Sequence, residues 1–343
     1  MLIALTVLSL LRSAKWWIRC MDFPRRQIAL GMFIVLVAFI SLYSINNLVD
    51  GVFVAALVFA LVYQGIQIFP FTIIAPKEVL QASSGKKDAR IRILVSNVLM
   101  ENKRADDFLT LVKENDPDIV LAVETNSWWD ERLKALDRDF PYSLKQPQEN
   151  YYGMHLFSKL ELGSPEIRFL IEEDIPSVRT AVRLRSGEWI DFFGVHPRPP
   201  EPYEDTEERD AEILTVGKQV KADGKPAIVA GDLNDVAWSH TTRLFQRISG
   251  TLDPRRGRGT FSTFHARYPM FRWPLDHIFH EASFTLISLK RLRNIGSDHF
   301  PVFAELQYTP RAVEQQEAPE ADQEDREEAR EKVAEGQRAA EAS

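Results

Sequence analysis

The sequence has almost no cysteine. Among its 343 residues, only Cys20 carries a thiol. A single thiol excludes a disulfide bond within the chain, and it excludes a zinc site built from several cysteines. The cysteine content gives no further information on the compartment in which the protein works.

Charge is missing from two long stretches, residues 28–45 and 52–75. At a helical rise of about 1.5 Å per residue, either stretch is long enough to cross a hydrocarbon core of about 30 Å. A short polar turn separates the two. The pattern predicts a transmembrane hairpin with helices at about 28–45 and 52–70. A pair of helices buried in a protein core is the alternative.

Basic residues are absent before the first apolar segment, residues 2–11, and crowd after it. The missing basic start argues against a cleaved signal peptide, so this segment is a partial crossing or an interfacial segment. Residues 1–27 then form a short apolar segment with a basic membrane flank. Because basic flanks stay in the cytoplasm, we expect a multi-pass protein of the cell inner membrane whose chain after the hairpin is cytoplasmic. The basic residues concerned are Arg12, Lys15, Arg19, Arg25 and Arg26, with Lys77, Lys86 and Lys87 beyond the hairpin.

Large apolar residues are scarce in the last segment, residues 310–343. From Arg311 onward there are eleven acidic and five basic residues, which give −6 of the chain's net charge of −7. The rest of the chain is therefore close to neutral, and the overall acidity says nothing about a substrate. Such a composition predicts an acidic low-complexity tail that is disordered or forms a solvated helix. A tail that binds partners is the alternative.

Strand and helix patterns alternate between a predicted linker at residues 76–89 and this tail. An apolar strand at 91–95, a helix at 105–115 and a second strand at 119–123 form a βαβ unit, whose strands are expected to be parallel or close neighbours. Further strands are expected at 153–157, 178–184, 189–195, 227–230 and 302–307, and a helix at 206–221. Residues 90–309 are thus predicted to be one α/β domain.

Polar residues follow several of these strands. Asp232 and Asn234 come directly after the strand at 227–230, and alternation along an extended chain points both side chains the same way. A carboxylate there can orient water or hold a cation, and an amide can donate to charge developing on a phosphate oxygen. An Asx turn without any catalytic role is the alternative.

Other strand ends carry the same kinds of group. Asn97 and Glu124 end the two strands of the βαβ unit, and His196 follows the strand at 189–195. Asp298 and His299 stand just before the last strand. His299 is either a catalytic imidazole beside an acid or a packing histidine whose hydrogen bonds are satisfied.

An arginine-rich loop lies between residues 255 and 273. Arg255, Arg256 and Arg258 alternate there with glycines, and aromatic residues including Trp273 follow. Such a mixture could bind phosphates and stack on bases. A solvated loop without ligands is the alternative.

Taken in order, the polar motifs resemble those of the endonuclease/exonuclease/phosphatase superfamily. The resemblance spans about residues 90–308 and implies an α/β (α+β) fold, a four-layer sandwich of two mixed β-sheets flanked by helices. Any single motif is weak, and the ordered set gives the resemblance its force. The motifs are Ser96-Asn97, Val123-Glu124-Thr125, Tyr152-Gly153-Met154-His155-Leu156-Phe157-Ser158-Lys159, Gly194-Val195-His196, Gly231-Asp232-Leu233-Asn234, Leu275-Asp276-His277-Ile278 and Ser297-Asp298-His299-Phe300-Pro301-Val302.

The resemblance also implies roles for the residues at these positions. Asn97 and Glu124 would hold a divalent cation, with Asp298 as a further ligand. Oxygen ligands favour Mg²⁺, and Mn²⁺ is the alternative.

The remaining motif residues would act on water and phosphate. By the same resemblance, Asp232 would orient the attacking water and Asn234 would bind the scissile phosphate. Asp276 would pair with His299 to form the general base. His196 stands where deoxyribonuclease and phosphatase members of the superfamily carry a histidine that contacts phosphate, which makes abasic-site repair less favoured.

The sequence therefore predicts a membrane-anchored Mg²⁺-dependent phosphohydrolase, nuclease-like, that uses water activated by a metal and a histidine. The arginine-rich loop and Trp273 favour nucleic acid as the substrate. The membrane tether favours a lipid headgroup or another small phosphoester. A non-catalytic scaffold with the same fold is the third alternative, and the oligomeric state stays open.

Overall fold

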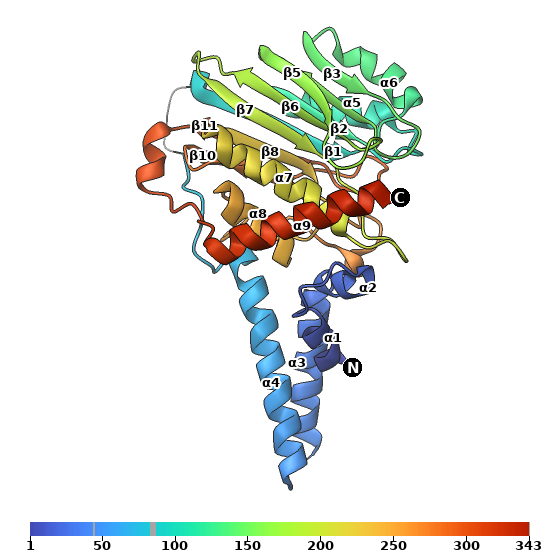
Figure 1. Cartoon of the computed structure of the whole chain (residues 1–343), viewed down its shortest axis with the longest axis vertical. Coiled ribbons are helices and arrows are strands. Elements are labelled where there is room, and N and C mark those ends of the chain that lie inside the picture. Colours follow the sequence, from blue (N-terminus) through green and yellow to red (C-terminus); the bar gives the residue numbers. More distant parts are fainter. Residues whose placement is uncertain (44, 83–86, 343) are drawn as a thin grey trace.

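Two mixed β-sheets pack face to face in the computed structural model, which describes residues 1–43, 45–82 and 87–342 (Figure 1). The first sheet has the order β10 (Phe284–Arg291), β11 (Val302–Tyr308), β1 (Arg90–Asn97), β2 (Ile119–Val123), β4 (Met154–Ser158) and β3 (Tyr142–Gln146). The second has the order β5 (Leu162–Phe169), β6 (Pro176–Arg183), β7 (Trp189–Val195), β8 (Ala227–Asp232) and β9 (Asp276–His280). The pairs β1–β2 and β7–β8 are parallel, and the other neighbours are antiparallel.

The main core lies between the two sheets. Side chains alternate along a strand, so one face of each sheet can be apolar and meet the other sheet. Val95 and Leu121 contribute from the first sheet, and Phe192 and Ile228 from the second. This packing fixes the two sheets relative to each other and brings their strand ends to a common edge.

Helices cover the outer face of each sheet. Helices α5 (Ala105–Asn115) and α6 (Ser127–Leu133) place Phe108 and Trp129 against the first sheet. Helices α7 (Glu207–Asp223) and α8 (His240–Ser249) place Leu214 and Phe245 against the second. The Ser239 side chain caps α8 by accepting the backbone N–H of Thr242. The predicted four-layer sandwich of two mixed sheets is confirmed.

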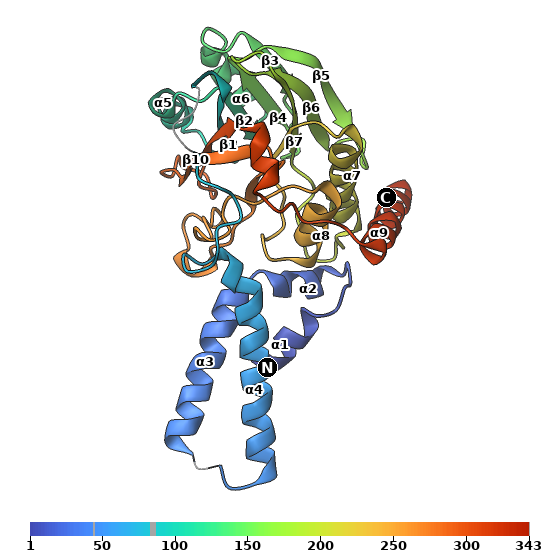
Figure 2. The same cartoon turned by 90° about the vertical axis from the view of Figure 1, so that its left-hand side faces the viewer.

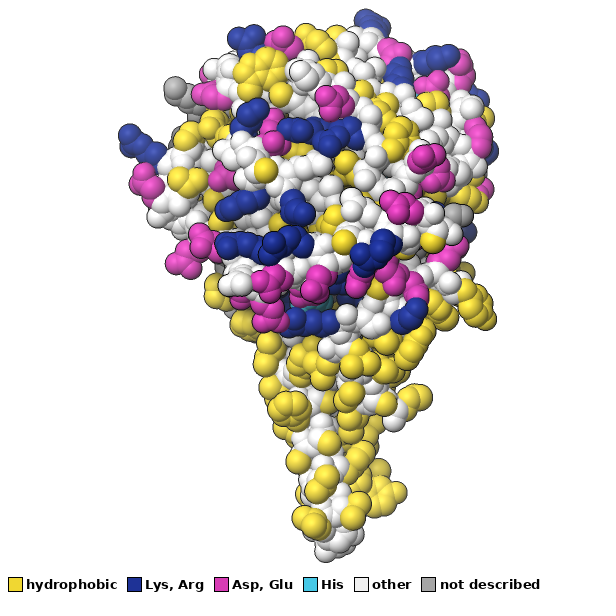
Figure 3. All heavy atoms as spheres, in the orientation of Figure 1, with side chains coloured by type: hydrophobic (Ala, Val, Ile, Leu, Met, Phe, Trp, Pro, Cys, Tyr) yellow, Lys and Arg dark blue, Asp and Glu magenta, His cyan; other side chains and the backbone are white. Residues whose placement is uncertain are grey.

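A helical hairpin projects from one end of the sandwich (Figures 1 and 2). It consists of α3 (Arg25–Leu42) and α4 (Leu48–Ile68), and its surface is largely apolar (Figure 3). Two helices, Arg25–Leu42 and Leu48–Phe71, are long and apolar enough to cross a membrane, although such helices also occur as signal sequences or in soluble cores. Only 17% and 22% of the two segments is buried, so the described chain leaves most of their apolar surface uncovered.

The residues before the hairpin form short helices. Helix α1 (Leu2–Leu8) has 7 residues, too few to cross about 30 Å of hydrocarbon. It lies beside α3 and α4, and Gln64 of α4 donates a hydrogen bond of 3.0 Å to the Thr6 hydroxyl. Helix α2 (Trp16–Arg19) and a short turn, Cys20–Asp22, then run beneath the sandwich to α3 (Figure 2).

The predicted linker is partly built into the sandwich. Val79 is buried in the main core, and Gln81 forms a β-bridge with Leu286. Residues 83–86 of that linker lie outside the described residues. The hairpin is therefore joined to the domain through a packed segment at residues 76–82.

The acidic tail ends in helix α9 (Gln323–Ala342), which lies along α7 (Figure 1). Ala329 and Val333 are buried against the second sheet's helices. At Gly336 a Cβ atom would collide with Ala211, so the two helices approach closely there. The expectation of disorder is wrong and the alternative of a helix is confirmed, but one face of this helix packs on the domain, because small residues at helical spacing form a narrow contact face among the charges.

Candidate active site

Polar side chains from both sheets meet at the edge where the parallel strand pairs end. Asn97 ends β1 and Glu124 follows β2, while Asp232 ends β8 and His196 follows β7. Parallel strands present their carboxyl ends at the same edge, which is where open α/β sheets bind ligands. Asp276 begins the antiparallel strand β9 opposite Asp232 and joins the same group.

Asn97 connects the two sheets. Its Nδ2 donates to Oε1 of Glu124 at 2.6 Å and to Oδ2 of Asp232 at 3.1 Å. Its Oδ1 accepts the backbone N–H of Leu99 at 3.0 Å. A metal ligand role needs the amide oxygen, which faces Leu99 in this arrangement, so that role stays a prediction.

Asp276 and His299 form a buried pair. Nδ1 of His299 lies 2.8 Å from Oδ2 of Asp276 and 3.5 Å from Oδ2 of Asp232. The bond to Asp276 orients the ring and leaves Nε2 available to another group. The ring of Phe264 packs against the imidazole, with 4.9 Å between ring centroids.

Carboxylates outnumber cationic groups at this edge. Burial opposes a charged imidazole, but Asp232 and Asp276 outweigh it and raise the pKa of His299 to about 10. Burial raises the pKa of the Glu124 carboxyl to about 7, and it raises the pKa of Asp232 although His299 opposes the shift. Burial lowers the pKa of His196 to about 4, so this ring is neutral at pH 7.

Three buried polar atoms of the site have no hydrogen-bond partner within the described residues. They are Oε2 of Glu124, Oδ1 of Asp276 and Nδ1 of His196. A buried atom of this kind costs free energy unless a ligand completes it. The free Glu124 oxygen and the surplus of carboxylates fit a divalent cation.

A cation could also be placed among Asp232, Asp276 and His299, whose ligand atoms lie within 4.8 Å of one another. We favour Glu124 for this role, because the hydrogen bond to Asp276 already uses Nδ1 of His299. Asp298 directly precedes His299 in the chain, and its predicted ligand role stays a prediction.

The backbone is unusual at two of these residues. Glu124 has a φ of 62° and Asn234 a φ of 51°, in the left-handed region that non-glycine residues seldom adopt. Such conformations persist where surrounding contacts hold them, and they are frequent at functional sites. At Gly231, with a φ of 149°, a Cβ atom would collide with the carbonyl oxygen of Val195 on β7, so this strand end requires glycine.

Buried hydrogen bonds hold the loop at residues 232–235, and two of them come from Arg209 and His277, for which the sequence predicted no role. Arg209 of α7 donates to the carbonyl of Asn234 at 3.0 Å. Nε2 of His277 lies 2.9 Å from the carbonyl of Asp235. The Asn234 side chain donates to the carbonyl of Pro197 at 2.9 Å. His277 stood next to Asp276 in a recognised motif, but nothing in the sequence of α7 distinguishes Arg209 from a surface arginine.

A second set holds Glu124 in place. Nδ1 of His155 lies 2.7 Å from the hydroxyl of Thr125, and its Nε2 lies 2.9 Å from a carboxylate oxygen of Asp130. A Cβ atom at Gly153 would collide with the carbonyl of Thr125, so only glycine permits this approach. The motif around His155 therefore positions the chain beside Glu124.

Residues 94–299 match the model of the Endonuclease/Exonuclease/phosphatase family. The match covers more than half of the chain. The chain belongs to this family. Members of the endonuclease/exonuclease/phosphatase family are phosphoester hydrolases that depend on divalent metals.

Solved structures share the fold at low sequence identity. The D. rerio TDP2 structure complexed with single strand DNA product is 16% identical, with a TM-score of 0.54 over 64% of this chain and 99% of that chain. The human Nocturnin catalytic domain with bound sulfate anion is 16% identical, with a TM-score of 0.55 over 70% and 99%. A Bacteroides vulgatus family member is 17% identical, with a TM-score of 0.52 over 64% and 99%. No curated protein matches the chain.

Several of the strand-end residues line a cleft of about 780 Å³. Its lining contains polar residues described above, including Glu124, His196 and His299. It also contains apolar residues, among them Trp273 and, from the segment before the hairpin, Phe23. The N-terminal segment, which lies outside the family match, therefore completes the cleft.

The three arginines of the arginine-rich loop do not line this cleft, although Trp273 of the same loop does. Arg255 is buried and its Nη2 lies 2.7 Å from Oδ2 of Asp253. Arg256 pairs with Glu78 at 2.7 Å. Arg258 donates to the carbonyl of Val79 at 2.6 Å. The expectation that these arginines are available to nucleic-acid phosphates is wrong, because Arg255 is buried against Asp253, and Arg256 and Arg258 hold the packed segment at residues 76–82 against the domain.

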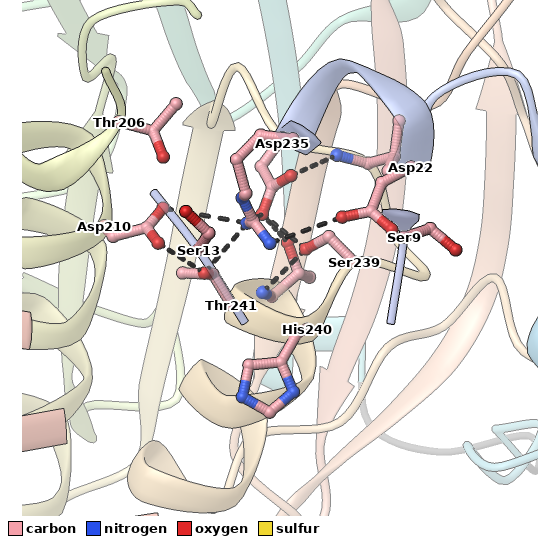
Figure 4. A network of polar contacts seen from close by, with 12 residues as sticks. Ser9, Ser13, Asp22, Thr206, Asp210, Asp235, Ser239, His240 and Thr241 are labelled. Atoms are coloured by element: carbon pink, nitrogen blue, oxygen red, sulfur yellow. Dashed lines mark hydrogen bonds and ion pairs between the residues drawn. The ribbon is translucent and has the colours of Figure 1, made fainter. Parts of the chain in front are cut away.

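A buried ionic network attaches the N-terminal segment to the loop at residues 232–235. Nη2 of Arg19 donates to the hydroxyl of Thr241 at 2.9 Å and lies 3.5 Å from Asp235 and 3.8 Å from Asp210. Its Nη1 lies 3.3 Å from Asp22. Figure 4 shows Asp22, Asp210, Asp235 and Thr241 around this contact. The carboxylates balance the arginine charge, so the segment before the hairpin belongs to the same folded unit as the site.

Proposed function

We propose that this protein is a membrane-anchored, metal-dependent phosphoester hydrolase. One observation carries the proposal. At the edge shared by the two sheets of a hydrolase fold, the buried Asp276–His299 pair lies with the Glu124 carboxylate, which has an oxygen without a partner among the described residues. Carboxylate and amide oxygens are ligands that Mg²⁺ prefers, and they also suit Mn²⁺. Glu124 would hold the cation, with Asp298 and Asn97 as further candidates.

The chain's own groups would perform the proton transfer and hold the phosphate. Nε2 of His299 would accept a proton from the attacking water, with Asp276 fixing the ring and Asp232 orienting the water. Asn234 and His196 would donate hydrogen bonds to phosphate oxygens. When bound, the cation would supply positive charge that neutralises the phosphate oxygens. The same charge would disfavour the protonated form of His299, so that the ring could accept a proton.

Anchoring and orientation belong to the same proposal. The apolar, largely uncovered surfaces of α3 and α4 support a membrane hairpin, and the basic residues on its flanks support a cytoplasmic domain at the inner membrane.

A nuclease activity is the second candidate. D. rerio TDP2, which has the same fold, was solved with a single strand DNA product. A linear nucleic acid could stack bases on Trp273 and Phe264 in the cleft.

Hydrolysis by the full chain in detergent tests the proposal. The substrates are bis(p-nitrophenyl) phosphate, p-nitrophenyl phosphate and a single-stranded oligonucleotide, each with Mg²⁺ and with EDTA. We expect turnover of at least one substrate that EDTA abolishes and that His299→Asn lowers by about 100-fold or more. Absence of turnover on all three, or equal turnover by the variant, would contradict the proposed function.

A further inference from the structure

A row of aromatic rings leads from the catalytic histidine to the top of the hairpin. The Phe264 ring lies 4.9 Å from His299 and 6.0 Å from Trp273, measured between ring centroids. Trp273 in turn packs edge-on against Phe23 at 5.6 Å. Phe23 directly precedes Pro24, the N-cap residue of α3. The apolar wall of the cleft is therefore continuous with the first hairpin helix.

Exposed apolar side chains surround this junction. Met270 and Phe271 are 66% and 59% exposed, and Gln27 of α3 donates to the carbonyl of Met270, which places their loop beside the hairpin. Ile73 and Ile74 are exposed just after α4. Figure 3 shows hydrophobic side chains at the base of the sandwich and along the hairpin. Side chains of this kind at the end of apolar helices suit an interface with a bilayer.

The charge of the cleft argues against a polyanion. Among the described residues that line it, there are acidic side chains, namely Glu124, Glu201 and Asp298, and neither lysine nor arginine. Single-stranded nucleic acids bind in positively charged grooves that follow the backbone. A ligand with one phosphate at the polar end and an apolar remainder fits both halves of the cleft.

We propose that the substrate is a membrane phospholipid. This inference rests on the proposed hydrolase function and names its substrate class. The phosphate lies at the Glu124–His299 end, and the apolar chains lie on the wall formed by Phe264, Trp273 and Phe23 and extend into the bilayer around the hairpin. Water adds to phosphorus, the phosphorus–oxygen ester bond breaks, and the proton taken by His299 passes to the leaving oxygen, which departs as an alcohol.

Turnover of lipid against soluble substrates tests the inference with the full chain. The protein is placed in nanodiscs of phosphatidylcholine that contain phosphatidylglycerol and phosphatidic acid, so that a diester and a monoester are both offered. Glycerophosphoglycerol, glycerol phosphate and single-stranded oligothymidylate serve as soluble probes with Mg²⁺. We expect at least one bilayer lipid to be hydrolysed about tenfold faster or more, at equal total concentration, than any soluble probe.

Variants of the apolar wall sharpen this comparison. Phe23→Ser and Phe271→Ser should lower lipid turnover about tenfold more than they lower turnover of the soluble probes, because the lipid alone uses the wall. Phe169→Ser, an exposed phenylalanine on β5 outside the cleft, is the matched control and should leave both rates unchanged. Equal losses on lipid and soluble substrates would overturn the inference.

A readout without turnover uses a photoreactive phospholipid. With the diazirine in its acyl chain and the protein carrying Glu124→Gln to prevent hydrolysis, we expect cross-links to residues 20–24 and 264–273. Cross-links confined to the outward faces of α3 and α4 would overturn the inference.

The outcomes separate the substrate class from the hydrolase function. Faster turnover of oligothymidylate than of any lipid would show that nucleic acid, and not lipid, is the substrate class. The hydrolase function would stand. No turnover of any probe would contradict the hydrolase function and the lipid inference together.

Discussion

Glu124 combines a left-handed backbone with a buried carboxylate oxygen that has no partner among the described residues. Its Oε1 accepts from Asn97, whereas Oε2 has no partner among the described residues. A side chain held in this way is prepared for a ligand that supplies positive charge, which is the physical basis of its proposed metal role.

The first prediction concerns Glu124→Gln, which preserves the shape of the side chain and removes its charge. We expect the Mg²⁺ concentration for half-maximal turnover to rise about 100-fold or more, because a neutral amide holds a divalent cation poorly. Titration of turnover against Mg²⁺ measures this. The control is Glu166→Gln, an exposed residue of β5, which should match the unmodified protein. An unchanged Mg²⁺ dependence would remove Glu124 from the metal site.

Glu212 of α7 is a second buried carboxyl, away from the strand-end residues of the site. Burial, with a smaller contribution from Glu172, raises its pKa from 4.5 to about 8. The folded protein therefore binds the proton more tightly than the unfolded chain does. The resulting contribution to stability is complete below pH 4.5 and is lost as the pH rises through 8.

The second prediction is that Glu212→Gln raises stability at pH 8, by up to a few kcal/mol, since one pKa unit corresponds to about 1.4 kcal/mol. Melting temperatures of the full chain in detergent, measured by tryptophan fluorescence between pH 4.5 and 8, should fall less with pH for the variant than for the unmodified protein. Glu166→Gln should follow the unmodified protein. Parallel curves for all three proteins would show that Glu212 does not titrate as described.

At the scale of elements, the short helix α2 connects the hairpin to the site through the ion pairs of Arg19. Arg19 at its end is surrounded by the carboxylates of Asp22, Asp210 and Asp235. Asp235 belongs to the loop that carries Asp232 and Asn234. Removing one partner from a buried ionic cluster leaves the others uncompensated.

The third prediction is that Arg19→Met destabilises the full chain by about 3–5 kcal/mol and lowers turnover, because Asp210 and Asp235 lose a buried partner. Thermal unfolding and hydrolysis of bis(p-nitrophenyl) phosphate measure the two effects. Arg26→Met, at an exposed residue whose Nη1 lies 3.4 Å from Thr260, is the control and should change stability little. If Arg19→Met has the same melting temperature as the control, the ion pairs of Arg19 contribute nothing to stability.

Helix α9 meets α7 through a narrow face of small residues. Gly336 stands where the helices are closest, beside Ala211 and the carbonyl of Glu207. Lys332 of α9 lies 3.0 Å from Asp210, so the helix also completes the charge balance of the Arg19 network.

The fourth prediction is that Gly336→Leu displaces α9, because the larger side chain cannot fit against Ala211 without a cost of about 1–3 kcal/mol. Limited proteolysis should then cleave the last helix faster than in the unmodified protein. Gln337→Leu adds the same side chain at the neighbouring exposed position and should leave the cleavage rate unchanged. Equal rates for the two variants would contradict the close packing of α9 on α7.

At the scale of the whole molecule, the hairpin and the sandwich form one body with the cleft at their junction. Phe23 and Pro24 line the cleft, and Arg19 pairs with Asp235 in the loop at residues 232–235. A fragment that starts after the hairpin would lack both, so the full chain is the proper material for every activity test.

The fifth prediction is topological. A reporter fused at Asn47, in the turn of the hairpin, should behave as periplasmic, and one fused at the end of the chain as cytoplasmic, because the basic residues before the hairpin stay inside. Paired alkaline phosphatase and fluorescent protein fusions measure this in bacterial cells. The opposite pattern would place the catalytic domain in the periplasm.

The sequence by itself determined the features that depend on short stretches of chain. Uninterrupted apolar runs predicted the hairpin. The apolar strand at 227–230, followed by Asp232 and Asn234, predicted one edge of the candidate site. The outer strand β3 was missed, because its side chains are exposed or only partly buried and give no apolar alternation. Strand β5 was missed for the same reason.

Only the tertiary structure decided which surfaces meet. The sequence could not show that Arg255 turns inward to Asp253, that α9 covers α7, or that Phe23 closes a cleft with Trp273. The first depends on a buried charge finding its partner, and the others join elements far apart in the chain. Such contacts are selected by the shape and charge of a packed whole, which short-range patterns do not encode.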